Sequence, residues 1–92
     1  MIRITFDPAK NARNIAERGL PFALVADLDW DGAIEREDTR KDYGEQRTLV
    51  AGMLNGRLHI AVVTARGGAI HVIGFRKANK KETRRYAEKI EG

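Results

Sequence analysis

The sequence predicts an α+β fold with two N-terminal helices, a mostly antiparallel β-sheet that contains a three-strand meander, and a C-terminal helix. The meander is predicted by three apolar segments joined at Asn55-Gly56 and Gly67-Gly68, residue pairs that are typical of two-residue hairpin turns. The helices are predicted by proline and capping residues on both sides of these segments. A chain of 92 residues, 42% of them hydrophobic, suffices for one core, so residues 1–92 are expected to form a single domain.

The N-terminal part predicts one strand and then two helices. The segment "IRITF" alternates apolar and polar residues, as a short strand does. Asp7 is a suitable N-cap and Pro8 a suitable first residue for a helix that runs to about Arg18 and ends at Gly19. Pro21 then opens a second, shorter helix in "PFALVADL", and "AIERED" is a candidate edge strand before a charged loop.

The remaining elements are three strands and a helix. The strands are "RTLVAGML", "RLHIAVVTAR" and "AIHVIGFR", and the helix runs from Asn79 to Ile90. Asn79 is the predicted cap, and Glu82 is placed three residues later for a capping box. The resulting order, β-α-α-β-β-β-β-α, places helices against a mostly antiparallel sheet.

Two-residue turns fix the pairing of strands, and the pairing predicts which side chains share a face of the sheet. The predicted pairs across the second turn are Thr64–His71, Val62–Ile73 and Ile60–Phe75. One face is then apolar and is expected to form the core, with Leu49, Ala51, Met53, Leu58, Ile60, Val62, Ile73 and Phe75. The end of that face carries a polar cluster of Glu45, Arg47, Thr64, Arg66 and His71. On the opposite face, His59 is expected to lie across from Arg76.

This polar cluster is a candidate catalytic site for metal-free cleavage of a phosphodiester. Guanidinium groups stabilise the charge of a pentacoordinate phosphate, and His71 or Glu45 can move the proton of a ribose 2′-hydroxyl. The alternative is a structural ion pair between Glu45 and Arg66 beside a partly buried His71. The strand register alone favours the structural alternative.

The charge is unevenly distributed along the chain. The formal net charge is +4, but acidic residues predominate from Asp27 to Glu45 and basic residues predominate from Arg76 onward. The basic group on the predicted last helix is Lys80, Lys81, Arg84 and Arg85. A basic end of this kind is typical of a protein that binds a polyanion, although a solvated helix also has a charged face.

Composition also limits the kinds of site and location that are expected. The absence of cysteine excludes disulfides and thiolate metal sites, and two histidines do not suffice for a metal site, so we expect no metal and no cofactor. The N-terminus lacks the layout of a signal peptide, and no apolar run approaches the roughly 20 residues of a membrane span. We therefore expect a soluble, cytoplasmic protein that makes no membrane contact.

With these residues in view, the sequence resembles the BrnT family of bacterial toxins along nearly the whole chain. The similar segments are "FDPAKNARNIAERGLPF", "GEQR" and "GRLHIAVVTARGGAIHVIGFRKANKKETRRY". The matching positions include Asp7, Pro8, Lys10, Asn14, Gly19, Phe22, Gly44, Glu45, Arg47, Gly52, Arg57, Thr64, Arg66, Ile70, Ile73, Arg76, Ala78, Glu82 and Tyr86. The order and spacing of these motifs carry the resemblance.

The resemblance implies a RelE-like fold and a metal-independent ribonuclease toxin of a type II toxin–antitoxin pair. It implies a BrnA-like antitoxin that dimerises, so that a heterotetramer is expected, and contact with operator DNA only through that antitoxin. It also assigns the polar cluster and Arg76 to the catalytic site, with RNA as the substrate. The basic group on the last helix would bind RNA or the antitoxin.

The sequence departs from the family pattern at several positions. Arg18 replaces a histidine before the glycine, and "HVIGFR" replaces the usual "RIISAR", so that His71, Gly74 and Phe75 stand for Arg, Ser and Ala. The last three changes lie in the suspected site. Two interpretations therefore remain open: a ribonuclease that uses His71, or a catalytically degenerate module that only binds antitoxin or nucleic acid.

Overall fold

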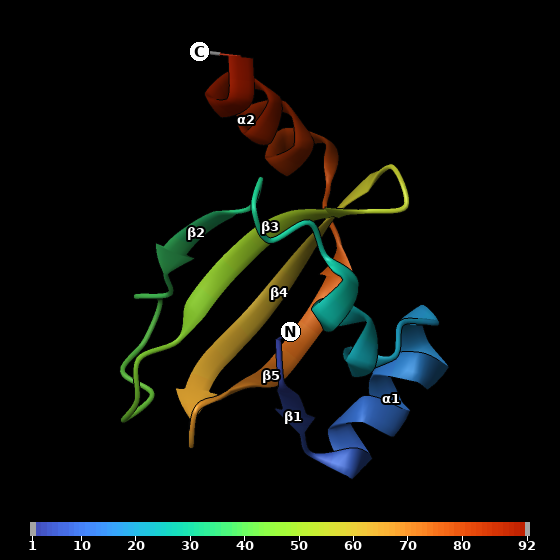
Figure 1. Ribbon diagram of the computed structural model, residues 1–92, viewed down its shortest axis with the longest axis vertical. Helices are drawn as coiled ribbons and strands as arrows, with labels where there is room; N and C mark the ends of the chain where they lie inside the picture. Colours follow the sequence, from blue (N-terminus) through green and yellow to red (C-terminus); the bar gives the residue numbers. More distant parts are fainter. Residues whose placement is uncertain (1, 92) are drawn as a thin grey trace.

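The computed structural model describes residues 2–91, and it consists of one five-stranded mixed sheet with helices at both ends of the chain (Figure 1). The elements are β1 (Ile4–Phe6), α1 (Pro8–Arg18), the 3-10 helix η1 (Phe22–Asp27), β2 (Ile34–Glu37), β3 (Thr48–Leu54), β4 (Arg57–Arg66), β5 (Ala69–Lys77) and α2 (Lys80–Glu91). The sheet order is β1-β5-β4-β3-β2. The predicted α+β class is confirmed. The predicted three-strand meander is too small, because β2 extends it at one edge and β1 pairs in parallel with β5 at the other.

The N-terminal helices follow the predicted starts, but the second is not an α-helix. The Asp7 carboxylate caps α1 through a 2.8 Å hydrogen bond from a backbone N–H of its first turn, and Gly19 ends the helix with a φ of 69°. The second helix, η1, is a 3-10 helix of six residues. Its three-residue period aligns Phe22, Val25 and Leu28 in one row, and all three are buried.

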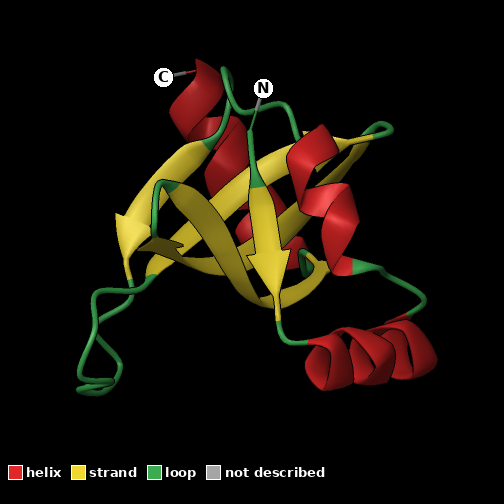
Figure 2. Ribbon diagram, turned by 60° about the horizontal axis from the view of Figure 1, so that its bottom comes forward, coloured by secondary structure: helices red, strands yellow, loops and turns green. Residues whose placement is uncertain are grey.

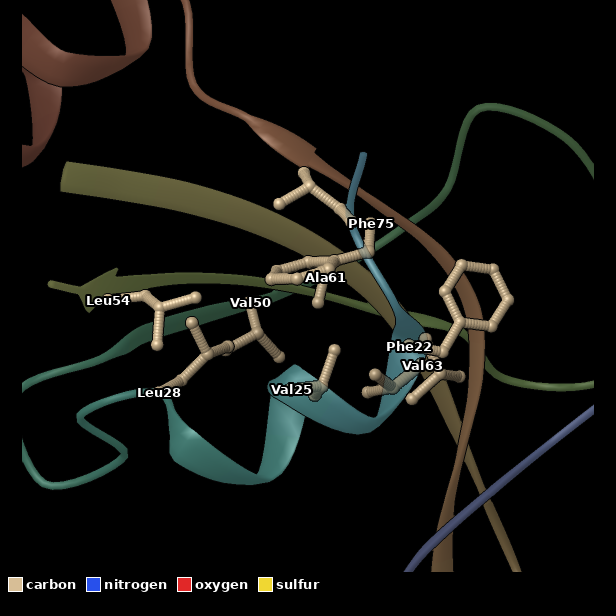
Figure 3. Packing of buried hydrophobic residues seen from close by; sticks show 10 residues of the cluster. Phe22, Val25, Leu28, Val50, Leu54, Ala61, Val63 and Phe75 are labelled. Atoms are coloured by element: carbon tan, nitrogen blue, oxygen red, sulfur yellow. The ribbon is translucent and has the colours of Figure 1, made fainter. Parts of the chain in front are cut away.

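One face of the sheet, called here the η1 face, carries the main core (Figure 3). The row of η1 packs on Val50, Leu54, Ala61, Val63, Val72 and Phe75. Gly52 of β3 faces this row, and a Cβ atom at this position would lie 3.4 Å from Cβ of Leu28. The helix and the sheet are thus in direct contact.

The opposite face, called here the α2 face, carries a smaller apolar cluster beneath the last helix. Its buried members are Leu58, Ile60 and Ala78, and its partly buried members are Leu49, Ala51, Met53 and Tyr86. The prediction that this face holds the main core is therefore wrong. The predicted capping box of α2 is confirmed, with 2.8 and 2.9 Å hydrogen bonds between Asn79 and Glu82. No helix within residues 2–91 is long and apolar enough to cross a membrane.

A β-bulge in β5 explains why the apolar faces differ from the prediction. The predicted pair Thr64–His71 is observed, but the register shifts between Val62 and Val63. Ile60 consequently lies opposite Arg76, and Ala61 lies opposite Phe75. The extra residue reverses the faces of the sheet on which the later side chains of β5 lie. The Phe75 ring enters the η1 face, and the Arg76 side chain lies on the α2 face.

Contacts from β4 and α1 hold the bulged strand in this register. Phe75 is buried and stacks on the ring of His59, with 5.3 Å between the ring centroids. The buried amide of Asn14 donates to the carbonyls of Phe75 and Leu20, at 3.0 and 2.7 Å. Because α1 is bonded directly to the backbone of β5, the packing of distant segments decides the register.

Candidate active site

The polar cluster is built around Glu45, which lies between two arginines. Nη2 of Arg66 lies 3.1 Å from Oε1 of Glu45, and Nε of Arg47 lies 3.3 Å from Oε2. The predicted ion pair between Glu45 and Arg66 is therefore confirmed, although Glu45 lies in the β2–β3 loop and not on a strand. Hydrogen bonds from Arg66 and then Arg47 hold the pKa of Glu45 below its usual value. The carboxylate fixes two guanidinium groups at neighbouring positions.

The segment that carries this carboxylate is fastened to the end of β4. Thr64 is buried, and its hydroxyl donates to the backbone carbonyl of Gln46 at 2.8 Å. This segment belongs to the β2–β3 loop, which lies beside the end of β4 in Figure 1. Arg66 lies on the same strand as Thr64, two residues further along. The hydrogen bond of Thr64 therefore holds the segment that carries Glu45 close to Arg66, the arginine that Glu45 binds.

His71 lies on β5 between Thr64 of β4 and Thr5 of β1. Its Nδ1 is 2.9 Å from the Thr5 hydroxyl, so the ring is held on the edge of the cluster. Burial, followed by the positive charge of Arg66, lowers the pKa of His71 below its usual value near 6.5. The imidazole is therefore neutral at physiological pH, the state in which it can accept a proton.

The bulge adds Arg76 to the face that carries Thr64 and His71. Strand alternation puts Arg76 beside Ile60 on the α2 face, so the sequence-based placement of Arg76 on the opposite face is wrong. Its guanidinium makes two hydrogen bonds with Glu82 of α2, at 2.8 and 2.9 Å. This pairing raises the pKa of Arg76 and lowers the pKa of Glu82 to about 2. Glu82 thus binds Arg76 and caps α2 at once.

A groove of about 220 Å³ opens on the α2 face between the sheet and α2. Its floor is apolar and consists of Ile34, Leu49, Ala51 and Ile60. Its walls carry five cationic side chains and one carboxylate, together with the ring of Tyr86: Arg36, Arg40, Arg76, Arg85, Lys89 and Glu82. Because Arg76 belongs to the wall, the groove and the polar cluster share one face of the sheet.

The predicted basic group of the last helix divides between this groove and the solvent. Arg85 lines the groove, whereas Lys80, Lys81 and Arg84 are exposed and do not line it. The sequence interpretation missed Arg36, Arg40 and Lys89. For Arg36 a signal existed, since it follows Ile34 by two residues in the candidate edge strand and must share its face.

The second histidine belongs to the core. His59 is 4% exposed, stacks on Phe75 and bonds the Arg57 carbonyl through Nδ1 at 2.9 Å. It lies opposite Lys77, so the predicted pairing with Arg76 is wrong. Among residues 2–91, no group of three or more His, Asp or Glu side chains could hold a metal ion.

Comparison with known proteins adds one finding. A family model described as "Ribonuclease toxin, BrnT, of type II toxin-antitoxin system" matches residues 6–82. The matched range includes the whole polar cluster, the bulge and the Arg76–Glu82 pair, and it stops within the first turn of α2. No curated protein matches the chain.

Proposed function

The chain belongs to the BrnT family of ribonuclease toxins of type II toxin–antitoxin systems, and we propose that it is a metal-independent endoribonuclease that inhibits growth and is neutralised by a BrnA-like antitoxin. The observation that carries this proposal is the juxtaposition of Glu45, two arginines and His71 at one end of the sheet. Positive charge and a proton acceptor are what cleavage of RNA by its own 2′-hydroxyl requires.

The proposed reaction is transesterification. The 2′-oxygen forms a bond to the adjacent phosphorus, and the bond from phosphorus to the 5′-oxygen breaks; the leaving 5′-oxygen takes a proton from water, so that the products are a 2′,3′-cyclic phosphate and a 5′-hydroxyl. His71 accepts the proton of the 2′-hydroxyl, because its lowered pKa keeps it neutral. The lowered pKa of Glu45 makes this carboxylate a weak base, so its role is to hold Arg47 and Arg66. These arginines stabilise the charge that develops on the phosphate.

RNA is proposed to extend from this cluster into the groove beneath α2. The apolar floor of the groove and the ring of Tyr86 suit the flat face of a base, and its cationic walls suit phosphates. Arg76 lies where the two regions share a face and is the candidate third catalytic arginine. A phosphate would have to replace Glu82 as the partner of Arg76.

The antitoxin is proposed to bind the exposed basic surface of α2, namely Lys80, Lys81, Arg84 and Arg85. An antitoxin dimer would then assemble a heterotetramer, and operator DNA would be contacted only through the antitoxin. Support comes from the charge of this surface and from its position beside the groove, where a bound protein would also obstruct RNA.

The second candidate is a catalytically degenerate module that binds antitoxin or nucleic acid without cleavage. It is favoured by the ion pairs that already occupy Glu45 and Arg76. The departure at Gly74 lies on the α2 face and also favours it, whereas the departure at Phe75 does not. The Phe75 ring lies in the η1 core, away from the α2 face, and Gly74 lies opposite Val62.

Incubation of purified protein with end-labelled RNA in excess chelator separates the two candidates. We expect cleavage to persist, and the products to carry 2′,3′-cyclic phosphate or 3′-phosphate ends. Cleavage that EDTA abolishes and magnesium restores would contradict the proposed mechanism. RNA binding without cleavage, by a protein that still arrests growth, would establish the degenerate module.

A further inference from the structure

The loop between β2 and β3, prominent in Figure 2, is organised around a buried carboxylate. The side chain of Asp38 is 1% exposed and accepts hydrogen bonds from the guanidinium of Arg40, both at 2.8 Å. It also accepts from the backbone N–H of Arg40 and from the hydroxyl of Tyr43, each at 3.2 Å. Hydrogen bonding to Arg40 holds the pKa of Asp38 well below its usual range. A permanently charged anchor therefore fixes the Tyr43 ring through its hydroxyl.

The Tyr43 ring in turn fixes Arg47. Cζ of Arg47 lies 4.0 Å from the centroid of the Tyr43 ring, within the range of a cation–π contact. The backbone N–H of Asp38 donates to the Arg47 carbonyl at 2.8 Å, so the same anchor positions both the main chain and the side chain of Arg47. Glu45 binds Nε of Arg47. With one face on the ring and Nε on the carboxylate, the terminal N–H groups of the guanidinium are left to bind a substrate.

We propose that Tyr43 is a positioning residue for Arg47, and that Asp38 and Arg40 serve to hold Tyr43. The inference rests on the proposed function, in which Arg47 contacts the scissile phosphate. A guanidinium on a long, flexible stem is effective in a transition state only when it is held in place beforehand. Here an aromatic face holds the guanidinium, a buried carboxylate holds that aromatic ring, and both come from the loop that carries Arg47 itself.

The test compares Tyr43→Leu, which removes the ring face, with Tyr43→Phe, which keeps the ring and loses the hydroxyl. Single-turnover cleavage and RNA affinity are measured for each. We expect Tyr43→Leu to lower the cleavage rate about tenfold with little change in affinity, and Tyr43→Phe to have a smaller effect. Lys41→Ala is the matched control, because Lys41 lies 5.5 Å from the same ring but is not part of the cluster. It should cleave at the wild-type rate.

A double-variant cycle decides whether the ring acts through Arg47. In an Arg47→Ala background, Tyr43→Leu should cause no further loss of rate. An equal loss in both backgrounds would overturn the proposal. The Nε–H signal of Arg47 in an NMR spectrum gives a readout that is independent of activity, since loss of the ring current must move it when Tyr43→Leu is introduced, whereas Tyr43→Phe retains the ring. A wild-type protein that cleaves no RNA would refute the proposed function, whereas an unmoved Arg47 signal in folded Tyr43→Leu would refute the positioning role.

Discussion

Replacing Glu82 with glutamine is expected to weaken the fold slightly while strengthening RNA binding. The side chains of Arg76 and Glu82 are 36% and 28% exposed, so their ion pair contributes only about 0.5 to 1 kcal/mol to stability. The glutamine oxygen can still accept from the N–H of Asn79, which preserves the capping box. For a domain of this size the melting temperature should fall by about 2 to 8 °C.

The same substitution releases Arg76 for a phosphate. In the wild type, RNA must displace a carboxylate that makes two hydrogen bonds with this guanidinium. Removing that competition returns the same 0.5 to 1 kcal/mol to binding, which corresponds to about a two- to fivefold gain in affinity. Fluorescence anisotropy with an RNA whose 2′-hydroxyls are methylated measures the affinity without cleavage, and circular dichroism measures the melting temperature.

Glu88→Gln provides the control, because Glu88 is an exposed residue of the same helix and the net charge changes equally. Equal gains in affinity for Glu82→Gln and Glu88→Gln would show that only net charge matters. A loss of affinity in Glu82→Gln would refute the reasoning outright, since it would mean that the carboxylate orients Arg76 for RNA and does not compete with it.

Three further outcomes are expected. His71→Ala should lower the cleavage rate about 100- to 10,000-fold and stay folded. His59→Ala should instead lose about 2 to 4 kcal/mol of unfolding free energy, because the His59 ring is buried against the core. Cleavage rates and denaturant unfolding of both variants check this. The pKa of Glu82 is about 2 in the folded protein and about 4.5 unfolded, so the stability that it contributes is present above about pH 4.5 and is lost as the pH falls toward 2; urea unfolding across this range should show a shallower pH dependence in Glu82→Gln. Charge reversal at Arg84 and Arg85 should weaken antitoxin binding and reduce its salt dependence, as titrations at several ionic strengths would show.

Features that depend on local chemistry could be predicted from the sequence. The turn at Asn55-Gly56 has φ angles of 51° and 77°, which few residue types adopt, so the sequence marks it unmistakably. The capping box of α2 is similarly local. The pairing of Glu45 with Arg66 could be predicted because the register set by the Asn55-Gly56 turn holds along the whole β3–β4 pairing.

Features that depend on distant packing could not be predicted. Val72 and Ile73 are adjacent apolar residues, and a strand containing both fits two registers equally well. The choice is made by α1, whose Asn14 bonds the Phe75 carbonyl, and by the stacked ring of His59. The contact between Tyr43 and Arg47 escaped prediction for the same reason, since it requires the β2–β3 loop to close on a buried carboxylate.

The bulge in β5 has a consequence for the tolerance of this strand to substitution. His71 and Arg76 share the α2 face although Arg76 is the fifth residue after His71. In an unbroken strand, residues that differ by an odd number of positions lie on opposite faces. In a saturation scan, sensitivity to polar substitution should therefore fall on even-numbered positions up to Val72 and on odd-numbered positions from Ile73 to Phe75. Substitutions that lower activity should fall on the other positions, odd-numbered up to His71 and even-numbered from Gly74 to Arg76. A single alternation maintained from Ile70 to Arg76 would be incompatible with the bulge.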